Sequence, residues 1–121
     1  MNFDQEQIFP LLESASEAQL DAAPFGIVRM DKSGLVTGYN AAEAALSGLS
    51  PERVIGKHFF SDVAPCTNNY LVAQRVETED SLDAMVDYVF TLRMKPTPVV
   101  LRLLKSPAQD RMYLLVQRRM P

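Results

Sequence analysis

The sequence predicts an α+β domain in which a five-stranded antiparallel sheet is flanked by helices and preceded by a helical cap. Two short strand patterns come early in the chain, and three longer ones close it at 84–94, 99–105 and 111–118, rich in Val, Leu, Tyr and Phe. Short helix patterns lie between the two groups of strands. This order is typical of the α+β class rather than of alternating α/β folds, and we expect the helices to cover one face of the sheet.

Length, composition and charge limit the class of protein. With 121 residues the chain has the size of one domain, and we expect residues 1–24 to form the cap and 25–121 the core. The formal net charge of -3 does not supply the basic surface that nucleic acid requires. Apolar runs are too short to span a membrane, and acids stand where a signal peptide carries cations. We therefore expect a cytoplasmic protein that binds neither nucleic acid nor membrane.

Residues 3–20 predict two short helices, because apolar side chains recur among Asp, Glu and Ser. We expect the break between them near Pro10 and residues 14–16. The sequence Pro-Phe-Gly at 24–26 then ends the cap.

A hairpin follows the cap. Strand patterns at 27–30 and 35–39 are separated by Asp-Lys-Ser-Gly, in which Gly34 tolerates a positive φ. Beyond the hairpin, Asn40 is a good N-cap for a helix at 41–46 that ends near Gly48.

Two further helices are predicted before the closing strands. Ser50-Pro51 is typical of a helix start, and this small helix runs to Ile55. An apolar segment at 58–66 contains proline just before the cysteine, and a helix is expected at 71–78.

Cys66 is the only cysteine, so no disulfide can form within the chain. Three interpretations are open at this point: a buried apolar residue, a reactive thiol, or an attachment point.

Tyr39 and Glu43 are four residues apart at a strand-to-helix junction, so both side chains can point to one side. No cation lies within one helical turn of Glu43, so burial would raise its pKa. The alternative is a solvated glutamate on the outer face of the helix. The spacing leaves both open.

Three motifs stand at residues 39–43 (Tyr-Asn-Ala-Ala-Glu), 54–60 (Val-Ile-Gly-Lys-His-Phe-Phe) and 62–67 (Asp-Val-Ala-Pro-Cys-Thr). Together they resemble the photoactive yellow protein family, blue-light receptors with a PAS-like fold. The order and separations also match, and the resemblance extends from about residue 19 to the closing strands.

The resemblance implies a p-coumaric acid (4-hydroxycinnamic acid) chromophore, attached as a thioester to Cys66. Tyr39 and Glu43 match the positions whose side chains hydrogen-bond the chromophore phenolate. In such a receptor, light isomerises the chromophore, Glu43 protonates the phenolate, and partial unfolding with release of the cap gives the signalling state. The implied protein is a monomer or weak homodimer that acts on a downstream signalling protein, and it is not an enzyme.

Other positions match the family less uniformly. Ser47 stands where the family usually has threonine, and its hydroxyl could still orient Tyr39. Leu49 replaces an arginine of the best-known members, which makes the pocket mouth apolar, and the loop from Thr67 to Leu71 is shorter than usual. The positions that match pocket-lining residues are Val28, Leu49, Phe59, Val63, Ala64, Thr67, Phe90 and Met94. A packed core would use the same residue types; Met94 alone has a sharper implied role, in thermal return of the chromophore.

Two other functions compete with the photoreceptor hypothesis. One is a chromophore-free PAS-type sensory or interaction module, made conceivable by Leu49. The other is a thiol enzyme with Cys66 as nucleophile and His58 as base, although no oxyanion-type glycine motif accompanies them. One histidine without clustered cysteines or acids predicts no metal site.

Overall fold

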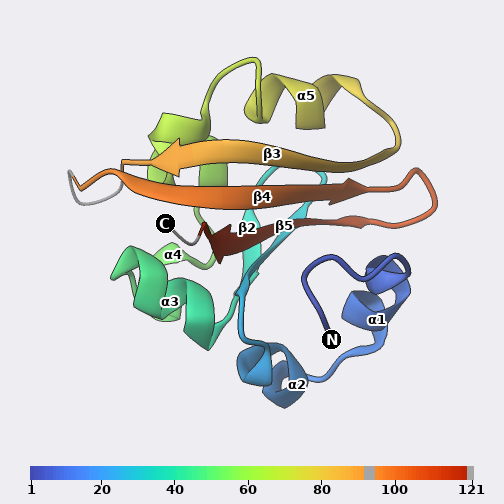
Figure 1. Ribbon diagram of the computed structural model, residues 1–121. Helices are drawn as coiled ribbons and strands as arrows, with labels where there is room; N and C mark the ends of the chain where they lie inside the picture. Colours follow the sequence, from blue (N-terminus) through green and yellow to red (C-terminus); the bar gives the residue numbers. More distant parts are fainter. Residues whose placement is uncertain (92–94, 120–121) are drawn as a thin grey trace.

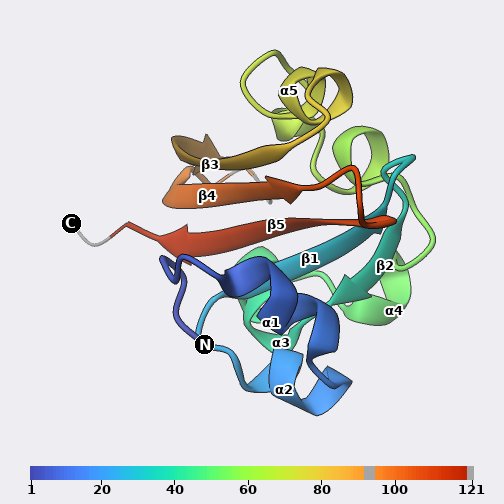
Figure 2. The ribbon, with the colours of Figure 1, turned by 90° about the vertical axis from the view of Figure 1, so that its right-hand side faces the viewer.

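A computed structural model describes residues 1–91 and 95–119. Its five strands form one antiparallel sheet in the order β2-β1-β5-β4-β3, seen in Figure 1 and, with every strand labelled, in Figure 2. They are β1 (Gly26–Asp31), β2 (Val36–Tyr39), β3 (Leu82–Phe90), β4 (Thr97–Lys105) and β5 (Arg111–Arg118). The predicted fold class and strand count are therefore confirmed. The first of the three long strands begins two residues before its predicted start, and the end of its predicted range lies outside the described residues.

Short helices connect and precede the strands. They are α1 (Ile8–Ser14), α2 (Glu17–Ala22), α3 (Ala41–Ser47), α4 (Pro51–Val54) and α5 (Ala73–Thr78). A π-helical turn, Phe59–Val63, and a 3-10 turn, Pro65–Thr67, occupy the segment that the sequence predicted only as apolar. Gly48 ends α3 with a φ of 76°, a left-handed conformation that glycine adopts without strain.

Pro10 does not separate α1 from α2, which corrects one part of the sequence prediction. It is the third residue of α1, within the first turn, where a backbone N–H has no partner in the helix. The break lies after Ser14, and Ser16 starts α2 with a capping box in which its side chain and that of Gln19 each accept a backbone N–H of the other.

Helices cover both faces of the sheet, not one as the sequence predicted. Along β5 the side chains alternate, with Met112, Leu114 and Val116 on one face and Tyr113 and Leu115 on the other. The first face carries what we call the main core, covered by α3, α4, α5 and the two short turns. Its buried residues include Val28, Met30, Tyr39, Val54, Phe59, Phe60, Val63, Ala64, Val72, Val76, Phe90, Leu101 and Leu114.

The opposite face is covered by the N-terminal helices. We call its cluster the cap core: Phe3, Ile8, Leu12, Leu20, Ala23, Phe25, Ile27, Leu104, Tyr113 and Leu115. Figure 2 shows α1 in the foreground, with α2 below it and α3 behind. The exact limits of the cap, residues 1–24, stay a prediction.

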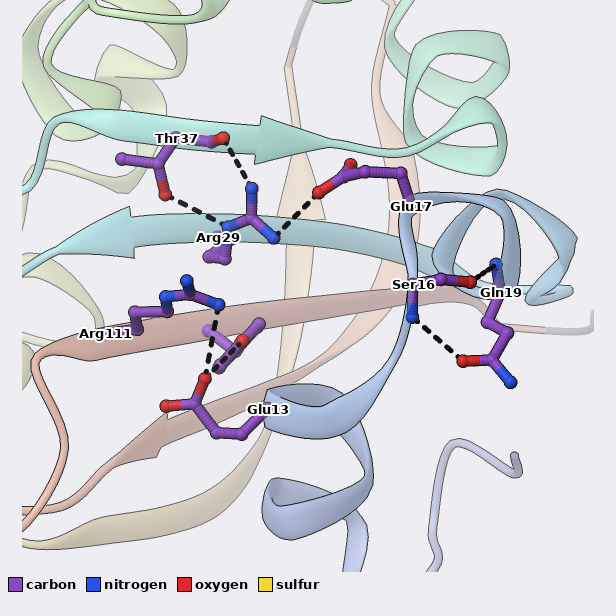
Figure 3. Close-up of polar contacts among 8 residues, drawn as sticks. Glu13, Ser16, Glu17, Gln19, Arg29, Thr37 and Arg111 are labelled. Carbon is purple, nitrogen blue, oxygen red and sulfur yellow. Dashed lines mark hydrogen bonds and ion pairs between the residues drawn. The ribbon is translucent and has the colours of Figure 1, made fainter.

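Polar contacts at its edge hold the cap to the sheet (Figure 3). Glu13 accepts a hydrogen bond from the Tyr113 hydroxyl at 3.0 Å and lies 3.5 Å from the guanidinium of Arg111. Glu17 pairs with Arg29 at 3.1 Å. The Glu17 side chain is 75% exposed, so this pair contributes little to stability.

Arg102 fastens the first residues of the chain to the sheet more firmly. Its side chain is only 4% exposed and binds both carboxylate oxygens of Asp83, at 2.8 and 2.9 Å. The remaining nitrogen, Nη1, donates to the carbonyls of Phe3 at 2.9 Å and Gln5 at 2.7 Å. A buried guanidinium needs such hydrogen-bond acceptors. The N-terminal segment is therefore held by Arg102, and the Nη1 donors of Arg102 are in turn paired only while that segment stays in place.

Replacing Arg102 by methionine keeps much of the apolar stem and removes the donors to Phe3 and Gln5. We expect the free energy of unfolding to fall by about 1–3 kcal/mol and amide exchange of residues 2–6 to become roughly tenfold faster. Denaturant titration and hydrogen exchange measure the two effects. The matched control is Arg75→Met, which removes a half-exposed pair with Glu79; equal exchange in both variants would show that Arg102 does not hold the segment.

Candidate functional site

Glu43 is fully buried, with no exposed surface. It belongs to the first turn of α3, where its backbone N–H donates to the Asn40 side chain at 3.0 Å. Neither carboxyl oxygen has a hydrogen-bond partner among the described residues. The interpretation of Glu43 as a solvated surface residue is therefore wrong.

Burial determines the charge of this carboxyl. Removal from water raises the pKa of Glu43 from its ordinary value of 4.5 to about 8, because no cation compensates for the lost hydration. At neutral pH the group is mostly protonated. It is thus a neutral hydrogen-bond donor inside the protein, with no acceptor among the described residues.

Gly26 makes room for the Glu43 side chain. A Cβ at Gly26, in β1, would overlap with Oε1 of Glu43, so only glycine lets the carboxyl lie this close to the strand. Sequence reasoning had treated Gly26 only as the end of the cap. A glycine at a strand start has many explanations, and nothing in the sequence connects this one to Glu43.

Tyr39 lies at the end of β2 with its side chain in the main core, 6% exposed. Its hydroxyl donates to Oγ of Ser47 at 2.8 Å, and the same Oγ accepts the N–H of Leu49 at 3.1 Å. Burial and, secondarily, the charge of Glu43 raise the pKa of Tyr39. Tyr39 is therefore a neutral donor, oriented by Ser47.

Asn40 connects this site with the cap. Its buried Oδ1 accepts the backbone N–H of Ile27 at 2.8 Å and of Glu43 at 3.0 Å. Its Nδ2 donates to the carbonyls of Leu20, in α2, at 2.9 Å and of Phe25 at 3.0 Å. The sequence predicted the N-cap but not these long-range contacts, which tie the helix that carries Glu43 to the segment that carries the cap.

Cys66 is partly buried in the 3-10 turn Pro65–Thr67 and packs against the main core. Its burial is incomplete, and this packing fits an apolar residue, a reactive thiol and an attachment point alike. The turn is stabilised by the hydroxyl of Thr67, which donates to the carbonyl of Ala64 at 2.6 Å. Tyr39 and Cys66 thus come from different parts of the chain to the same core.

The remaining predicted pocket residues gather around the same core. Those that are buried are Val28, Phe59, Val63, Ala64, Thr67 and Phe90. Leu49 is partly buried and packs against them, and Met94 lies outside the described residues. Their burial agrees with a pocket lining and equally with ordinary packing, so their contact with a ligand stays a prediction.

His58 contacts Ser61 rather than forming a pair with Cys66. Its Nδ1 lies 3.2 Å from the backbone nitrogen and 2.9 Å from the hydroxyl oxygen of Ser61. Within residues 1–91 and 95–119, no cluster of His, Cys, Asp and Glu is placed to hold a metal ion. None of the helices in that part of the chain is long and apolar enough to cross a membrane.

Comparison with known proteins identifies the class and then the family. A model of the PAS fold matches residues 15–120. "Photoactive yellow protein" of Rhodothalassium salexigens is 36% identical over 98% of this chain and 97% of its own, and that of Halochromatium salexigens is 37% identical over the same shares. The crystal structure of the photoactive yellow protein domain from the sensor histidine kinase Ppr of Rhodospirillum centenum superimposes with a TM-score of 0.83, at 38% identity, covering 90% of this chain and 98% of that one.

The chain therefore belongs to the photoactive yellow protein family of PAS domains, which are photoreceptors and not enzymes. This confirms the predicted family and fold. The thiol-enzyme alternative is wrong.

The raised pKa of Glu43 predicts how the stability of the protein without a bound chromophore depends on pH. Between the ordinary pKa of 4.5 and about 8, the folded state holds a proton that the unfolded state releases. The free energy of unfolding should therefore decrease as pH rises through this window, by up to about 1.4 kcal/mol per unit.

Urea titrations from pH 5 to 9 measure this slope. Glu43→Gln should flatten it, whereas Glu79→Gln, which changes a half-exposed carboxyl, should leave it unchanged. A slope that survives in Glu43→Gln would assign the effect to another group.

Proposed function

We propose that this protein is a blue-light receptor that carries a p-coumaroyl group as a thioester on Cys66. The observation that carries the proposal is the buried, neutral carboxyl of Glu43, which has no acceptor among the described residues and lies in the same site as Tyr39. Family membership supports the same conclusion.

The residues of the site suit a buried phenolate. An anion in a low-polarity core costs several kcal/mol unless donors surround it. Protonated Glu43 and Tyr39 are two such donors, and hydrogen bonds to an ionised oxygen are shorter and stronger than neutral ones. Glu43 in turn gains the acceptor that it lacks.

Ser47 allows Tyr39 to serve the anion without losing its own partner. A hydroxyl group both donates and accepts, and its hydrogen rotates to suit its surroundings. Tyr39 would donate to the phenolate and accept a hydrogen bond from Ser47, while Ser47 would still accept the N–H of Leu49. The replacement of threonine by Ser47 thus keeps the function of the hydroxyl.

Cys66, in the turn Pro65–Thr67, would hold the tail of the ligand. When bound, the p-coumaroyl group supplies absorption of blue light and isomerisation about its double bond. Val28, Phe59, Val63, Ala64, Thr67 and Phe90 would exclude water around it, and Met94 would assist its thermal return. With Leu49 in place of arginine, the mouth of the pocket has no cation from this position.

Glu43 is the proton donor after light. Passing its proton to the phenolate leaves Glu43 charged in a site that provides no compensating cation, which is costly. That cost favours movement of α3, and Asn40 connects α3 directly with Leu20 and Phe25. Release of the cap then exposes the apolar residues of the cap core, and this newly exposed surface meets a downstream signalling protein.

Attachment is tested by adding an activated p-coumaric acid ester to the purified protein. We expect a mass increase at Cys66 and a visible band that bleaches in blue light and recovers in the dark. Intact mass and absorption spectra measure both, and Cys66→Ala should show neither. Wild-type protein that forms no adduct or no band would favour the chromophore-free PAS module instead.

The proton-transfer step is tested with Glu43→Gln in the loaded protein. Glutamine still donates to the phenolate but has no proton to transfer, so the light-induced increase in amide exchange of residues 8–25 should be lost while the band remains. Glu79→Gln is the matched control. Cap exchange that responds to light equally in both variants would exclude Glu43 as the origin of the structural change.

A further inference from the structure

The carbonyl of Cys66 is held by two side chains that have no part in the proposed photochemistry. Tyr88, in β3, donates its hydroxyl to this carbonyl. Asn69 donates from Nδ2 both to the Tyr88 hydroxyl, at 2.6 Å, and to the same carbonyl, at 3.3 Å. Each of the three residues is thus hydrogen-bonded to the other two, and we call this group the Cys66 triad.

Asn69 also fastens the loop that follows Cys66. Its Oδ1 accepts the N–H of Leu71 at 3.0 Å and of Val72 at 3.2 Å, just before α5. One amide side chain therefore joins the cysteine turn to the start of the next helix.

Tyr88 connects the Cys66 triad to the sheet. It points to the main-core side of β3, and its ring packs edge-to-face on Phe90 with 6.2 Å between centroids. β3 pairs with β4 along its whole length. The Tyr88 hydroxyl is therefore carried by a hydrogen-bonded strand, whereas Cys66 belongs to a three-residue turn.

We propose that Tyr88 and Asn69 are positioning residues for Cys66: by holding its carbonyl they hold the backbone of the turn, and with it the position from which its side chain extends. The thiol is attached to this turn through Cα and Cβ, so a turn released from Tyr88 and Asn69 could shift and carry Sγ with it. The inference rests on the proposed function, since it concerns how the thiol is presented to the p-coumaroyl group.

Two reactions of the unloaded protein test this. In acylation by a p-coumaroyl thioester, the Cys66 thiolate attacks the acyl carbon, a new C–S bond forms, and the bond to the departing thiolate breaks. Alkylation by iodoacetamide uses the same thiolate but needs no fit to the pocket. The ratio of the two rates therefore reports positioning, because the thiolate fraction cancels.

Tyr88→Phe removes one donor, and we expect acylation to slow and alkylation to quicken, changing the ratio by about two- to tenfold. Asn69→Asp keeps the acceptor for Leu71 and Val72 but loses both donors, and it should lower the ratio too. Tyr70→Phe is the matched control, because Tyr70 belongs to the same loop and is 74% exposed. Melting temperatures identify any variant that is merely unstable.

If the ratio of acylation to alkylation rates in Tyr88→Phe and in Asn69→Asp equals that in Tyr70→Phe, the proposal is overturned. A parallel rise of the acylation and alkylation rates would also overturn it, because it indicates general loosening of the structure. If the wild-type protein is not acylated at all, the proposed function fails instead. Amide exchange of residues 66–68 then decides the positioning role by itself: faster exchange in Tyr88→Phe than in Tyr70→Phe supports it, and equal exchange rejects it.

Discussion

The buried carboxyl of Glu43 constrains the whole main core, because a group without compensating charge is stable there only in its neutral form. Two neighbouring residues accommodate this carboxyl. Gly26 leaves space for the carboxyl, and Asn40 fixes the start of the helix that carries it. The same carboxyl is a good donor while it keeps its proton and a destabilising charge once it loses it.

Asn40 connects the helix that carries Glu43 with the segment that leads to the other face of the sheet. A single amide satisfies two N–H groups on the Glu43 side and two carbonyls at the base of the cap. The cap itself is held by an apolar cluster, by weak exposed pairs such as Arg29 with Glu17, and by the stronger buried contacts of Arg102. Separation of this cap from the sheet, with the main core still folded, is the structural change that we propose.

The sequence predicted the strands best, since Val, Leu and Tyr runs with turn residues between them have few alternatives. It failed on Pro10, because its place depends on where α1 begins, and on the cap, which covers a sheet face that no local pattern assigns to it. At the site, the motifs led to Tyr39, Glu43 and Cys66. They did not lead to Gly26, Tyr88 or Asn69, whose importance lies in neighbours far away in the chain.

The protonation state of Glu43 tests the proposed proton transfer most directly, by infrared spectroscopy of the chromophore-bound protein with carboxyl-labelled glutamate, before and after blue light. We expect a protonated carboxyl band in the dark at neutral pH, which is absent in Glu43→Gln. Blue light should replace this band with a carboxylate band. A carboxylate at Glu43 in the dark, or a protonated band that light leaves unchanged, would contradict the proposed proton transfer.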